Sequence, residues 1–473
     1  MVSPQLKPSV LVIGAGPTGL TAGWKLAERG HCVTVAERAP VVGGMSASFT
    51  VAGQRVDFGS HRLHGKADPA LLRELKALMG DGLQARQRNG RIRLEGEWVG
   101  FPLRAGALIA HLPRRFAIGA AFDSLTSSLR RPAADDFGSI VRAGLGPTVF
   151  EAFYGPYAKK LWGVDARELD GSMAQRRVSA GGPIDIAKRL LAARNEEGRI
   201  FYYPRNGYGQ ICEAFAEAAT NAEAEVRLAT KVTSLSFEGD RAQATLVSTS
   251  AADEEEAELL EADVVVSTIP ATRLVDITTP APAEDVRSSA ASLESRGMVF
   301  VYLVVPRAQY TPYDAHYFPS LDTAIARLSE PKNYRTGTDP EDLTVLCAEL
   351  ACSVGDEVWS MDDEALGDLV ARELQQLGLP APAHVETLVR RLGSVYPVYR
   401  HGFQSHLDAI EFWAQTQPGL ITAGRQGLFV PDNLHHTIAM GRAVSQVIDD
   451  DGTIDRVAWT RARNEFRSHV VED

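Results

Sequence analysis

Three glycines near the start of the chain have the spacing of a phosphate-binding turn. Gly14, Gly16 and Gly19 form GxGxxG with Pro17 and Thr18 between them, directly after a short apolar run. The first glycine permits a tight turn, the second lets a pyrophosphate approach the backbone, and the third lets the next helix pack closely. The N-terminus of that helix would offer free N–H groups to an anion. Such glycine triplets are also common in loops, so the neighbouring residues decide the interpretation.

An acidic residue at the end of the next expected strand supplies a nucleotide partner. Glu37 follows the apolar segment 31–36 and comes 18 residues after Gly19. A carboxylate at this place accepts hydrogen bonds from an adenosine ribose and repels a 2′-phosphate, so NADP is disfavoured. The alternative is an ordinary strand-end carboxylate in solvent.

A second glycine pair distinguishes FAD from NAD. Gly43 and Gly44 follow the acid and would bring the chain to the pyrophosphate from the other side. The stretch DFGSHRLH, residues 57–64, then forms a polar turn beside an aromatic residue, which suits contact with an isoalloxazine ring. The sequence therefore predicts FAD, mainly bound by the first 62 residues. The further contacts expected in this stretch are Arg38, Met45, Gly59, Ser60, His61 and Arg62.

These motifs resemble the flavoprotein superfamily of amine oxidases, protoporphyrinogen oxidases and UDP-galactopyranose mutases. The resemblance begins with GAGPTGLTAG, AERAPVVGG and DFGSHRLH. It continues in order through PTVFEAFYGPYAKKLWG, FYYPRNGYGQICEAFAEA, ADVVVSTIP, RGMVFVYLVV, RLSEPKNY, SVYPVYRHG and GRQGLFVPDNLHHTIAMG. Matches along most of the chain indicate the superfamily, but they do not indicate a substrate.

The resemblance extends the FAD site to later segments of the chain. It implies that Val232 meets the adenine through its backbone, and that Gly424 and Arg425 approach the flavin from the C-terminal side. It also implies that the last helix, near residues 433–436, directs its dipole at the flavin's pyrimidine ring, which stabilises the anionic reduced flavin. The residues concerned there are Asn433, Leu434 and His435.

Two histidines occupy positions that bear on the flavin site. Relatives often carry Asn-x-Asp-His in the last segment, whereas this chain has His435 in place of the Asp, which changes the local charge. His61 matches a histidine that lies against the flavin in the mutases. A structural role is the alternative for His61.

Candidate substrate residues lie in the segments between the nucleotide motifs. A polar-aromatic cluster suits a ring-shaped or sugar-like ligand, although a helix with a mixed face would have the same composition. Paired arginines would clamp a diphosphate, whereas single arginines usually lie at the surface or in ion pairs. The cluster is Tyr154, Tyr157, Lys160 and Trp162, and the further candidates are Arg205, Arg296, Arg327, Tyr334 and Arg400. Of all these candidates, His61, Arg205 and Tyr334 are predicted to be catalytic.

The elements that position these residues follow from hydrophobic patterning. Strands are expected at 10–13, 31–36, 262–269, 299–305 and 420–423, with a ladder over 226–247 and hairpin strands over 86–99. Helices are expected at 18–29, 69–79, 183–196, 207–220 and 361–378, with a helix-rich stretch at 104–150 and a final helix at 436–449. The acidic tract 252–262 reads as a solvated turn.

The predicted fold class is therefore α/β. A Rossmann-like FAD-binding domain of the glutathione-reductase type, with an inserted α+β substrate domain, explains the order of the motifs. We expect the FAD-binding domain to comprise residues 1–65, 221–295 and 411–473. Residues 66–220 and 296–410 would form the substrate domain, which covers the cofactor.

Composition limits the partners. The chain has 473 residues and a net charge of −11, which argues against nucleic-acid binding and against binding to anionic membranes. Its four cysteines are scattered without metal-ligand spacing, so we expect reduced thiols and no metal. No stretch has the length and polarity of a signal peptide or a membrane span, which favours a cytoplasmic protein. The oligomeric state stays open.

Three functions are consistent with these motifs and with the resemblance. The first is an oxidoreductase that transfers hydride from a small-molecule substrate, an amine, alcohol or sugar derivative, to FAD. The second is an isomerase resembling UDP-galactopyranose mutase, which would use reduced FAD on a nucleotide sugar. The third is a flavin-binding scaffold without turnover, which the polar-aromatic cluster argues against. No nucleophile triad is evident, as expected where a cofactor carries the chemistry.

Overall fold

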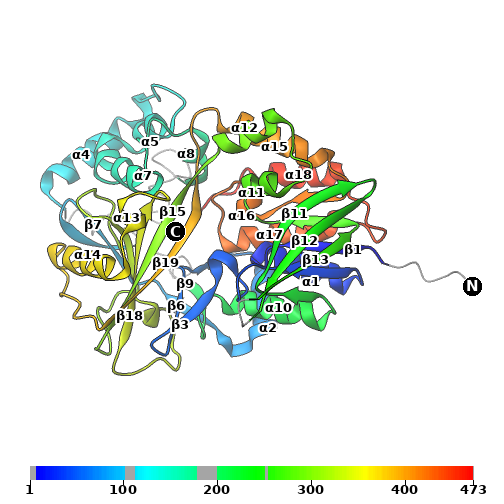
Figure 1. Cartoon of the computed structure of the whole chain (residues 1–473). Coiled ribbons are helices and arrows are strands. Elements are labelled where there is room, and N and C mark those ends of the chain that lie inside the picture. The colour runs from blue at the N-terminus through cyan, green and yellow to red at the C-terminus, as the bar shows by residue number, and fades with distance from the viewer. Residues whose placement is uncertain (1–6, 66, 102–111, 178–199, 251–253, 472–473) are drawn as a thin grey trace, which may run out of the picture.

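A computed structural model describes residues 7–65, 67–101, 112–177, 200–250 and 254–471 (Figure 1). One of its sheets is five-stranded and parallel, with the strand order β10-β2-β1-β14-β20. These strands come from distant parts of the chain: β1 Ser9–Ile13, β2 Cys32–Ala36, β10 Glu225–Arg227, β14 Val264–Ser267 and β20 Leu420–Thr422. Neighbouring parallel strands need crossover connections, and here the longest of these connections contain the other sheets and helices of the protein.

Helix α1, Pro17–Glu28, connects β1 to β2 and is buried along most of its length. It begins with a proline at its first turn, where the absent N–H is not needed. Helices α10, Gln210–Asn221, and α17, Leu434–Val447, pack against it. The predicted Rossmann-like unit is therefore present, and this packing fixes the end of α1 that carries the glycine turn.

Two predictions for the region after residue 224 need correction. The Val226 segment is not in the ladder but forms β10, at the edge of the parallel sheet. The ladder consists of β11 Thr230–Glu238, β12 Arg241–Thr249 and β13 Glu255–Ala262. The described part of the acidic tract, residues 254–262, is thus largely strand rather than turn, and residues 252–253 lie outside the described residues. One edge of the ladder can carry glutamates because their side chains remain exposed to water.

A seven-stranded sheet forms the second layer, with the order β19-β15-β18-β17-β16-β7-β8. Its strands are β7 Gly90–Leu94, β8 Glu97–Phe101, β15 Glu294–Val305, β16 Ala315–Tyr317, β17 Ile325–Ser329, β18 Thr344–Cys352 and β19 Glu386–Val398. Helix α14, Asp363–Gln376, packs on β15 and β19. The predicted hairpin is β7–β8, whereas β6, Leu83–Gln87, pairs with β9, Ile200–Pro204, and β5, Leu63–His64, in a separate sheet.

Short helices cover one end of the second sheet (Figure 1). They are α4 Arg114–Leu125, α5 Phe137–Leu145, α6 Pro147–Val149, α7 Gly155–Trp162 and α8 Ser172–Arg177. Helix α7 contacts β17, β18 and β19, which brings Trp162 over the sheet. The predicted helix at 183–196 lies outside the described residues, and so does the start of the predicted helix-rich stretch, up to residue 111.

The predicted final helix is not the last one. α17 is followed by α18, Arg456–Phe466, which packs against it. Helices α11, Ala271–Ile277, α12, Glu284–Ser292, and α15, Phe403–Thr416, lie on the same side of the molecule (Figure 1). In the described part of the chain, no helix has the length and apolar character needed to cross a membrane.

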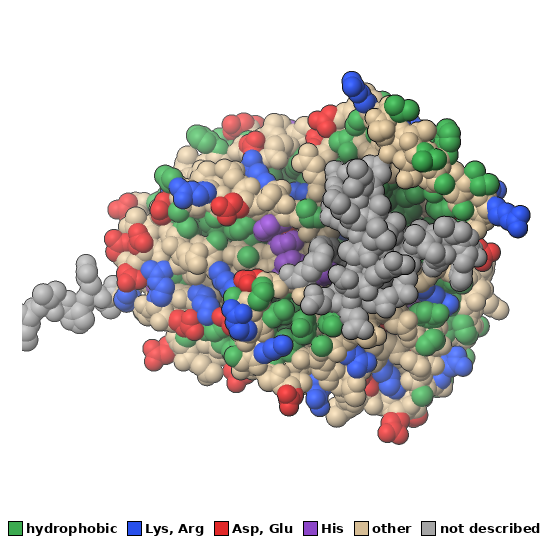
Figure 2. Space-filling model, turned by 180° about the vertical axis from the view of Figure 1, so that it is seen from behind, with side chains coloured by type: hydrophobic (Ala, Val, Ile, Leu, Met, Phe, Trp, Pro, Cys, Tyr) green, Lys and Arg blue, Asp and Glu red, His purple; other side chains and the backbone are tan. Residues whose placement is uncertain are grey.

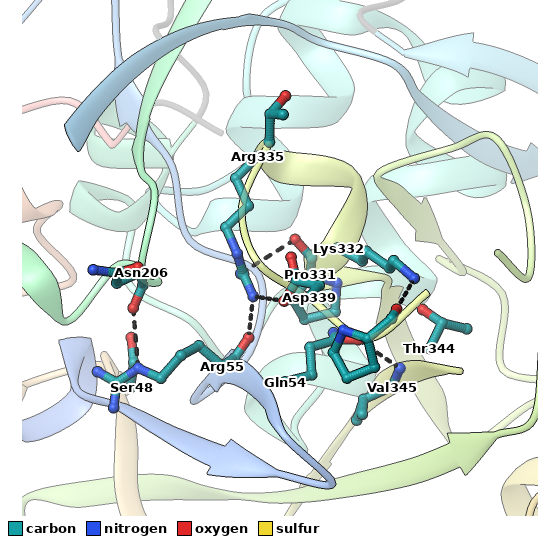
Figure 3. Close-up of polar contacts among 12 residues, drawn as sticks. Ser48, Gln54, Arg55, Asn206, Pro331, Lys332, Arg335, Asp339, Thr344 and Val345 are labelled. Carbon is teal, nitrogen blue, oxygen red and sulfur yellow. Dashed lines mark hydrogen bonds and ion pairs between the residues drawn. The ribbon is translucent and has the colours of Figure 1, made fainter. Parts of the chain in front are cut away.

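A hairpin of β3, Ser48–Val51, and β4, Gln54–Asp57, leads into the predicted flavin turn and is tied down from two sides (Figure 3). Arg335 donates to Arg55 O at 2.7 Å and pairs with Asp339. Arg55 in turn donates to Asn206 O at 3.0 Å. These contacts fix the hairpin to the loop after β17 and to the loop after β9, and so fix the segment that follows β4.

Candidate functional site

The turn after β1 has the shape that the three glycines predict. Gly14 has φ +103° and donates to Ala36 O at 2.8 Å. A Cβ added to Gly19 would lie 2.0 Å from Gly14 O, so only glycine fits there. A Cβ added to Gly16 would meet no atom within 4 Å. The protein therefore needs glycine at position 19 for packing, but it leaves open space in front of Gly16.

The second glycine pair lies directly against this turn. Gly43 and Gly44 both have positive φ, +110° and +54°, in the region that favours glycine. Gly43 donates to Ala15 O at 2.8 Å, and a Cβ on Gly44 would lie 3.7 Å from Gly16 Cα. Two backbone segments without side chains thus border the same space.

Glu37 braces the turn from the end of β2. One carboxylate oxygen accepts from Ala15 N and the other from Ala39 N, both at 2.9 Å. Each oxygen keeps a lone pair, so the buried carboxylate can still accept from a ribose hydroxyl. Its neighbour Arg38 is exposed, and Val232 is buried on β11, which contacts β2.

Residues from the far end of the chain close the glycine turn. A Cβ on Gly424, which has φ +81°, would lie 3.0 Å from Thr18 Oγ1. That hydroxyl donates to Thr437 O in α17 at 2.8 Å. Gln426 donates to Met45 Sδ at 3.5 Å. The segments that the resemblance assigns to one cofactor therefore lie together.

Arg425 is held at the start of α17. Its Nη1 donates to Asp432 O and its Nη2 to Val395 O, both at 2.9 Å. Asn433 caps α17 in a capping box with His436, and Leu434 is buried in the first turn. The guanidinium of the half-buried Arg425 thus lies beside the N-terminus of α17, and the two together suit an anionic or electron-rich group.

Next to this N-terminus is a histidine cluster. The ligand atoms of Asp432, His436 and His469 lie within 4.8 Å of one another, so they could in principle hold a metal. Arg176 forms an ion pair with Asp432 at 3.4 Å, and its charge and the positive end of α17 both oppose a cation. We interpret the 2.6 Å contact from His469 Nδ1 to Asp432 as a tie between the chain end and α17. His435 lies beside His436, with ring centroids 4.0 Å apart.

A buried network holds the predicted flavin turn. Glu349 accepts from Ser60 N at 2.8 Å and from Arg327 through two bonds of 2.8 and 2.7 Å. Ser60 Oγ also meets Tyr334 OH at 2.5 Å. A Cβ on Gly59 would lie 2.8 Å from Glu349 Oε1. Arg327 and Tyr334 therefore have protein partners that fix the turn.

Arg62 has a protein partner as well. It pairs with buried Asp314 at 3.0 Å, donates to Tyr317 OH at 3.2 Å, and lies over the rings of Phe201 and Tyr334. Burial by itself would lower the pKa of Arg62, but Asp314 raises it above its ordinary value. The Arg62 side chain therefore stays protonated, and the carboxylate of Asp314 balances its charge.

His61 is different from its neighbours. Its ring stacks on Tyr208, with centroids 5.2 Å apart and an angle of 10° between the planes. Burial, with Arg327 and Arg425 nearby, lowers the pKa of His61 to about 3, so the ring is neutral at pH 7. Its Nδ1 is buried without a hydrogen-bond partner among the described residues. A neutral imidazole with an unused nitrogen is available to a ligand.

Four buried nitrogens gather near Tyr396 in a cation–aromatic cluster. Arg177 lies 5.5 Å from the ring centroids of both Trp162 and Tyr396, and Arg425 lies 5.7 Å from that of Tyr396. Arg296 is the register partner of Tyr396 between β15 and β19. Trp162 Nε1 and the Nε atoms of the three arginines have no hydrogen-bond partner within the described ranges. Buried donors usually have partners, so this concentration points to a ligand.

A cavity of about 280 Å³ adjoins this cluster and is lined by Trp162, Arg296 and Arg400 among others. Three of the predicted substrate residues thus share one cavity. Arg400 is already paired with Glu168 and Glu294, both at 2.9 Å. Arg296 is partly engaged too, because its Nη1 donates to Ser353 Oγ and its Nη2 to Ala351 O. The donors that remain for a ligand among the described residues of this cavity are therefore Trp162 Nε1 and Arg296 Nε.

The remaining substrate candidates are not in this cluster. Lys160 is buried and donates to two backbone carbonyls at 2.7 and 2.9 Å, and burial lowers the pKa of this lysine to about 8. Tyr154 and Tyr157 pack around Phe153. Arg205 is exposed.

Sequence reasoning missed three residues of the site. Arg177 lies in a run of two arginines after the 147–163 match, and Tyr396 lies within the SVYPVYRHG segment, so both had a weak signal. Glu349 lies in an apolar strand and has no recognisable motif around it. Only the pairing of β17 with β18 brings it to Arg327.

Solved structures share this fold over nearly the whole chain. A reduced UDP-galactopyranose mutase aligns with a TM-score of 0.79 and 19% identity, covering 98% of this chain and 100% of that one. A protein from Exiguobacterium sp. 255-15, provisionally assigned as a protoporphyrinogen oxidase, has a TM-score of 0.70 and 19% identity, covering 93% and 99%. Cyclohexylamine oxidase from Brevibacterium oxydans has a TM-score of 0.64 and 15% identity, covering 93% and 99%.

Family matches agree with the fold. Residues 12–78, which include the glycine turn and Glu37, match the NAD(P)-binding Rossmann-like domain. Residues 163–444 match the flavin-containing amine oxidoreductases, and they include Tyr396, the three arginines near it and the start of α17. Because the second match covers more than half of the chain and the predicted superfamily agrees, the chain belongs to the flavin-containing amine oxidoreductase family of enzymes.

Proposed function

We propose that the flavin of this enzyme is FAD and that it lies between the glycine turn and α17. The open space before Gly16, bordered by Gly43 and Gly44, fits a pyrophosphate that approaches bare backbone. Glu37 would hold the ribose, and Arg425 with the N-terminus of α17 would face the flavin ring. The cofactor supplies hydride or electron-pair chemistry, and the protein supplies position, charge and a dry surrounding.

The substrate pocket is best suited to an anionic or strongly polar group. The supporting observation is the set of unpartnered donors on Trp162, Arg177, Arg296 and Arg425 around Tyr396. Burial lowers the pKa values of Arg296 and Arg425, which is unfavourable for the free protein and favours a negatively charged partner. A cationic amine would be repelled at this place.

We therefore favour the oxidation of a small alcohol or sugar derivative that carries a carboxylate or phosphate. The arginines would orient the anionic group, and Trp162 and Tyr396 would pack on a ring. His61, neutral and with Nδ1 unpaired, can form a hydrogen bond to the cofactor or the substrate, and its pKa of about 3 makes it a group that orients rather than one that takes up a proton. Tyr334 has its hydroxyl engaged by Ser60, so it supports the turn in this proposal.

A mutase-like isomerisation of a nucleotide sugar is the second candidate. Two observations favour it: the alignment with UDP-galactopyranose mutase spans 98% of this chain, and three arginines near one tyrosine could clamp a diphosphate. At 19% identity the alignment carries the fold alone, so the donor cluster is the stronger support.

One experiment separates the two candidates. The purified yellow protein is mixed anaerobically with carboxylated or phosphorylated alcohols and sugars, and the flavin absorbance is followed. Bleaching by the substrate alone supports oxidation. Turnover of a nucleotide sugar that requires prior reduction by dithionite supports isomerisation. Absence of both, in protein that retains its flavin, contradicts both candidates.

A further inference from the structure

Asp432, the residue before the N-cap of α17, is a buried carboxylate in contact with two arginines. Its Oδ1 lies 3.4 Å from Arg176 Nη1, and its Oδ2 lies 2.6 Å from His469 Nδ1. Its backbone carbonyl accepts from Arg425 Nη1 at 2.9 Å. One residue therefore holds Arg176 through its charge and Arg425 through its backbone, at the start of the helix that is expected to face the flavin.

The charged side chains gathered around Asp432 are mostly cationic. Arg177 follows Arg176 at the end of α8, and within the described ranges neither Arg177 nor Arg425 has a carboxylate at ion-pair distance. Burial raises the pKa of Tyr399, the three arginines lower it and Asp432 raises it, so all four charges act on one ring. Asp432 thus brings one negative charge to a cluster that carries three positive charges.

Two neighbouring ionisable groups leave this balance unchanged. Arg296 has a carboxylate of its own, Asp356, at 3.9 Å. His436 contacts the rings of two further histidines, with centroids 4.0 and 4.1 Å away, and Figure 2 shows histidine side chains gathered at one place on the surface. Burial lowers the pKa of His436 to about 3, so this ring is neutral at pH 7. Burial also lowers the pKa of Arg425, and the charge of Asp432 opposes this shift.

We propose that Asp432 is a positioning residue that orients the cluster of Arg176, Arg177 and Arg425 and limits how strongly this cluster attracts an anion. The inference rests on the proposed function, in which the arginines hold an anionic group of the substrate. The ion pair with Asp432 fixes the end of α8, which carries Arg177, and the carbonyl fixes Arg425. Binding that is equally tight before and in the transition state lowers KM without raising kcat, so a counter-charge keeps the anion exchangeable.

The test is the affinity of the flavin-loaded protein for inorganic phosphate, measured by calorimetry at pH 8, above the ordinary histidine pKa of about 6.5. Asp432→Asn keeps the size of the side chain and an acceptor for Arg176 but removes the charge. Phosphate should therefore bind to this variant about tenfold or more tightly than to the wild type. Asp432→Glu keeps the charge and should bind phosphate like the wild type, even where its longer side chain lowers the melting temperature.

A purely structural role would give the opposite order, because asparagine fits the space of Asp432 better than glutamate. The proposal is overturned if Asp432→Asn binds phosphate no more tightly than the wild type, or if Asp432→Glu changes the affinity as much as Asp432→Asn. The matched control is Asp136→Asn, at a buried carboxylate that caps α5. This control should lower the melting temperature and leave the phosphate affinity unchanged.

A further variant separates this inference from the proposed function. Arg177→Met should weaken phosphate binding if the arginine cluster is the anion site. Phosphate binding that is the same in Arg177→Met and the wild type, or that is absent from the wild type and from Asp432→Asn, overturns the proposed pocket and the inference together. Binding that depends on Arg177 but does not respond to Asp432→Asn overturns the inference alone.

Discussion

The glycine turn at Gly14–Gly19 and the network around Glu349 both position parts of the proposed flavin site, but they do so by different means. The turn depends on short-range backbone geometry: a Cβ on Gly19 has no room, and one on Gly16 meets nothing. The network depends on Arg327, Glu349 and Ser60, which are brought together by strands far apart in the sequence. A motif therefore reveals the first kind of site, and only the fold reveals the second.

The largest expected effect is at the packed glycine. Gly19→Ala would place a Cβ 2.0 Å from Gly14 O, so the turn and α1 cannot both keep their positions. We expect loss of flavin from the purified protein together with a lower melting temperature. Absorbance of the flavin and thermal unfolding measure the two effects. A Gly19→Ala protein with normal flavin content and stability would contradict this account of the turn.

Removing one charge from the buried network should be the next largest effect. Glu349→Gln leaves Arg327 buried without its counter-ion, which should lower the free energy of unfolding by about 3–5 kcal/mol. The same substitution in an exposed pair, Glu284→Gln beside Arg287, should cost less than about 1 kcal/mol. Urea unfolding measures the free energy of unfolding of both variants against the wild type. Equal effects would show that the network does not hold the turn.

The donor cluster should affect binding more than folding. Arg177→Met removes a donor whose Nε has no partner within the described structure, so the affinity for an anionic substrate should fall by roughly 10–100-fold. Arg400→Gln, at a residue already paired with two glutamates, is the control and should change this affinity little. Measuring KM for the anionic substrate with both variants tests this prediction. If Arg400→Gln has the larger effect, the pocket has been assigned to the wrong donors.

The smallest effect at neutral pH is at His316 in the second sheet, and it grows as the pH falls. Burial, with Arg91 nearby, lowers the pKa of His316 from 6.5 to about 3. The folded state therefore binds this proton less well than the unfolded state, and stability is lost as pH falls below about 6.5. His316→Gln should reduce the slope of unfolding free energy against pH by up to about 1.4 kcal/mol per unit. Urea unfolding between pH 7 and 4.5 tests this, and an unchanged slope would contradict it.

Parts of the molecule were predictable where the signal was local. The βαβ unit, the two glycine segments and helix α14 follow from patterns within a few dozen residues. The roles of Arg327 and Lys160 did not follow, because their partners come from other strands and an arginine or lysine looks the same in either setting. The acidic strand β13 was missed because its pairing with β12, rather than its composition, fixes its structure.

The most direct test of the account is Gly16→Ala. Gly16 has φ −75°, which alanine adopts readily, and a Cβ there meets no protein atom within 4 Å. The unfolding free energy of the flavin-free protein should thus stay within about 0.5 kcal/mol of the wild type. If FAD occupies the space before Gly16, its dissociation constant should rise about tenfold or more. A variant that binds FAD as tightly as the wild type would contradict the proposed place of the cofactor.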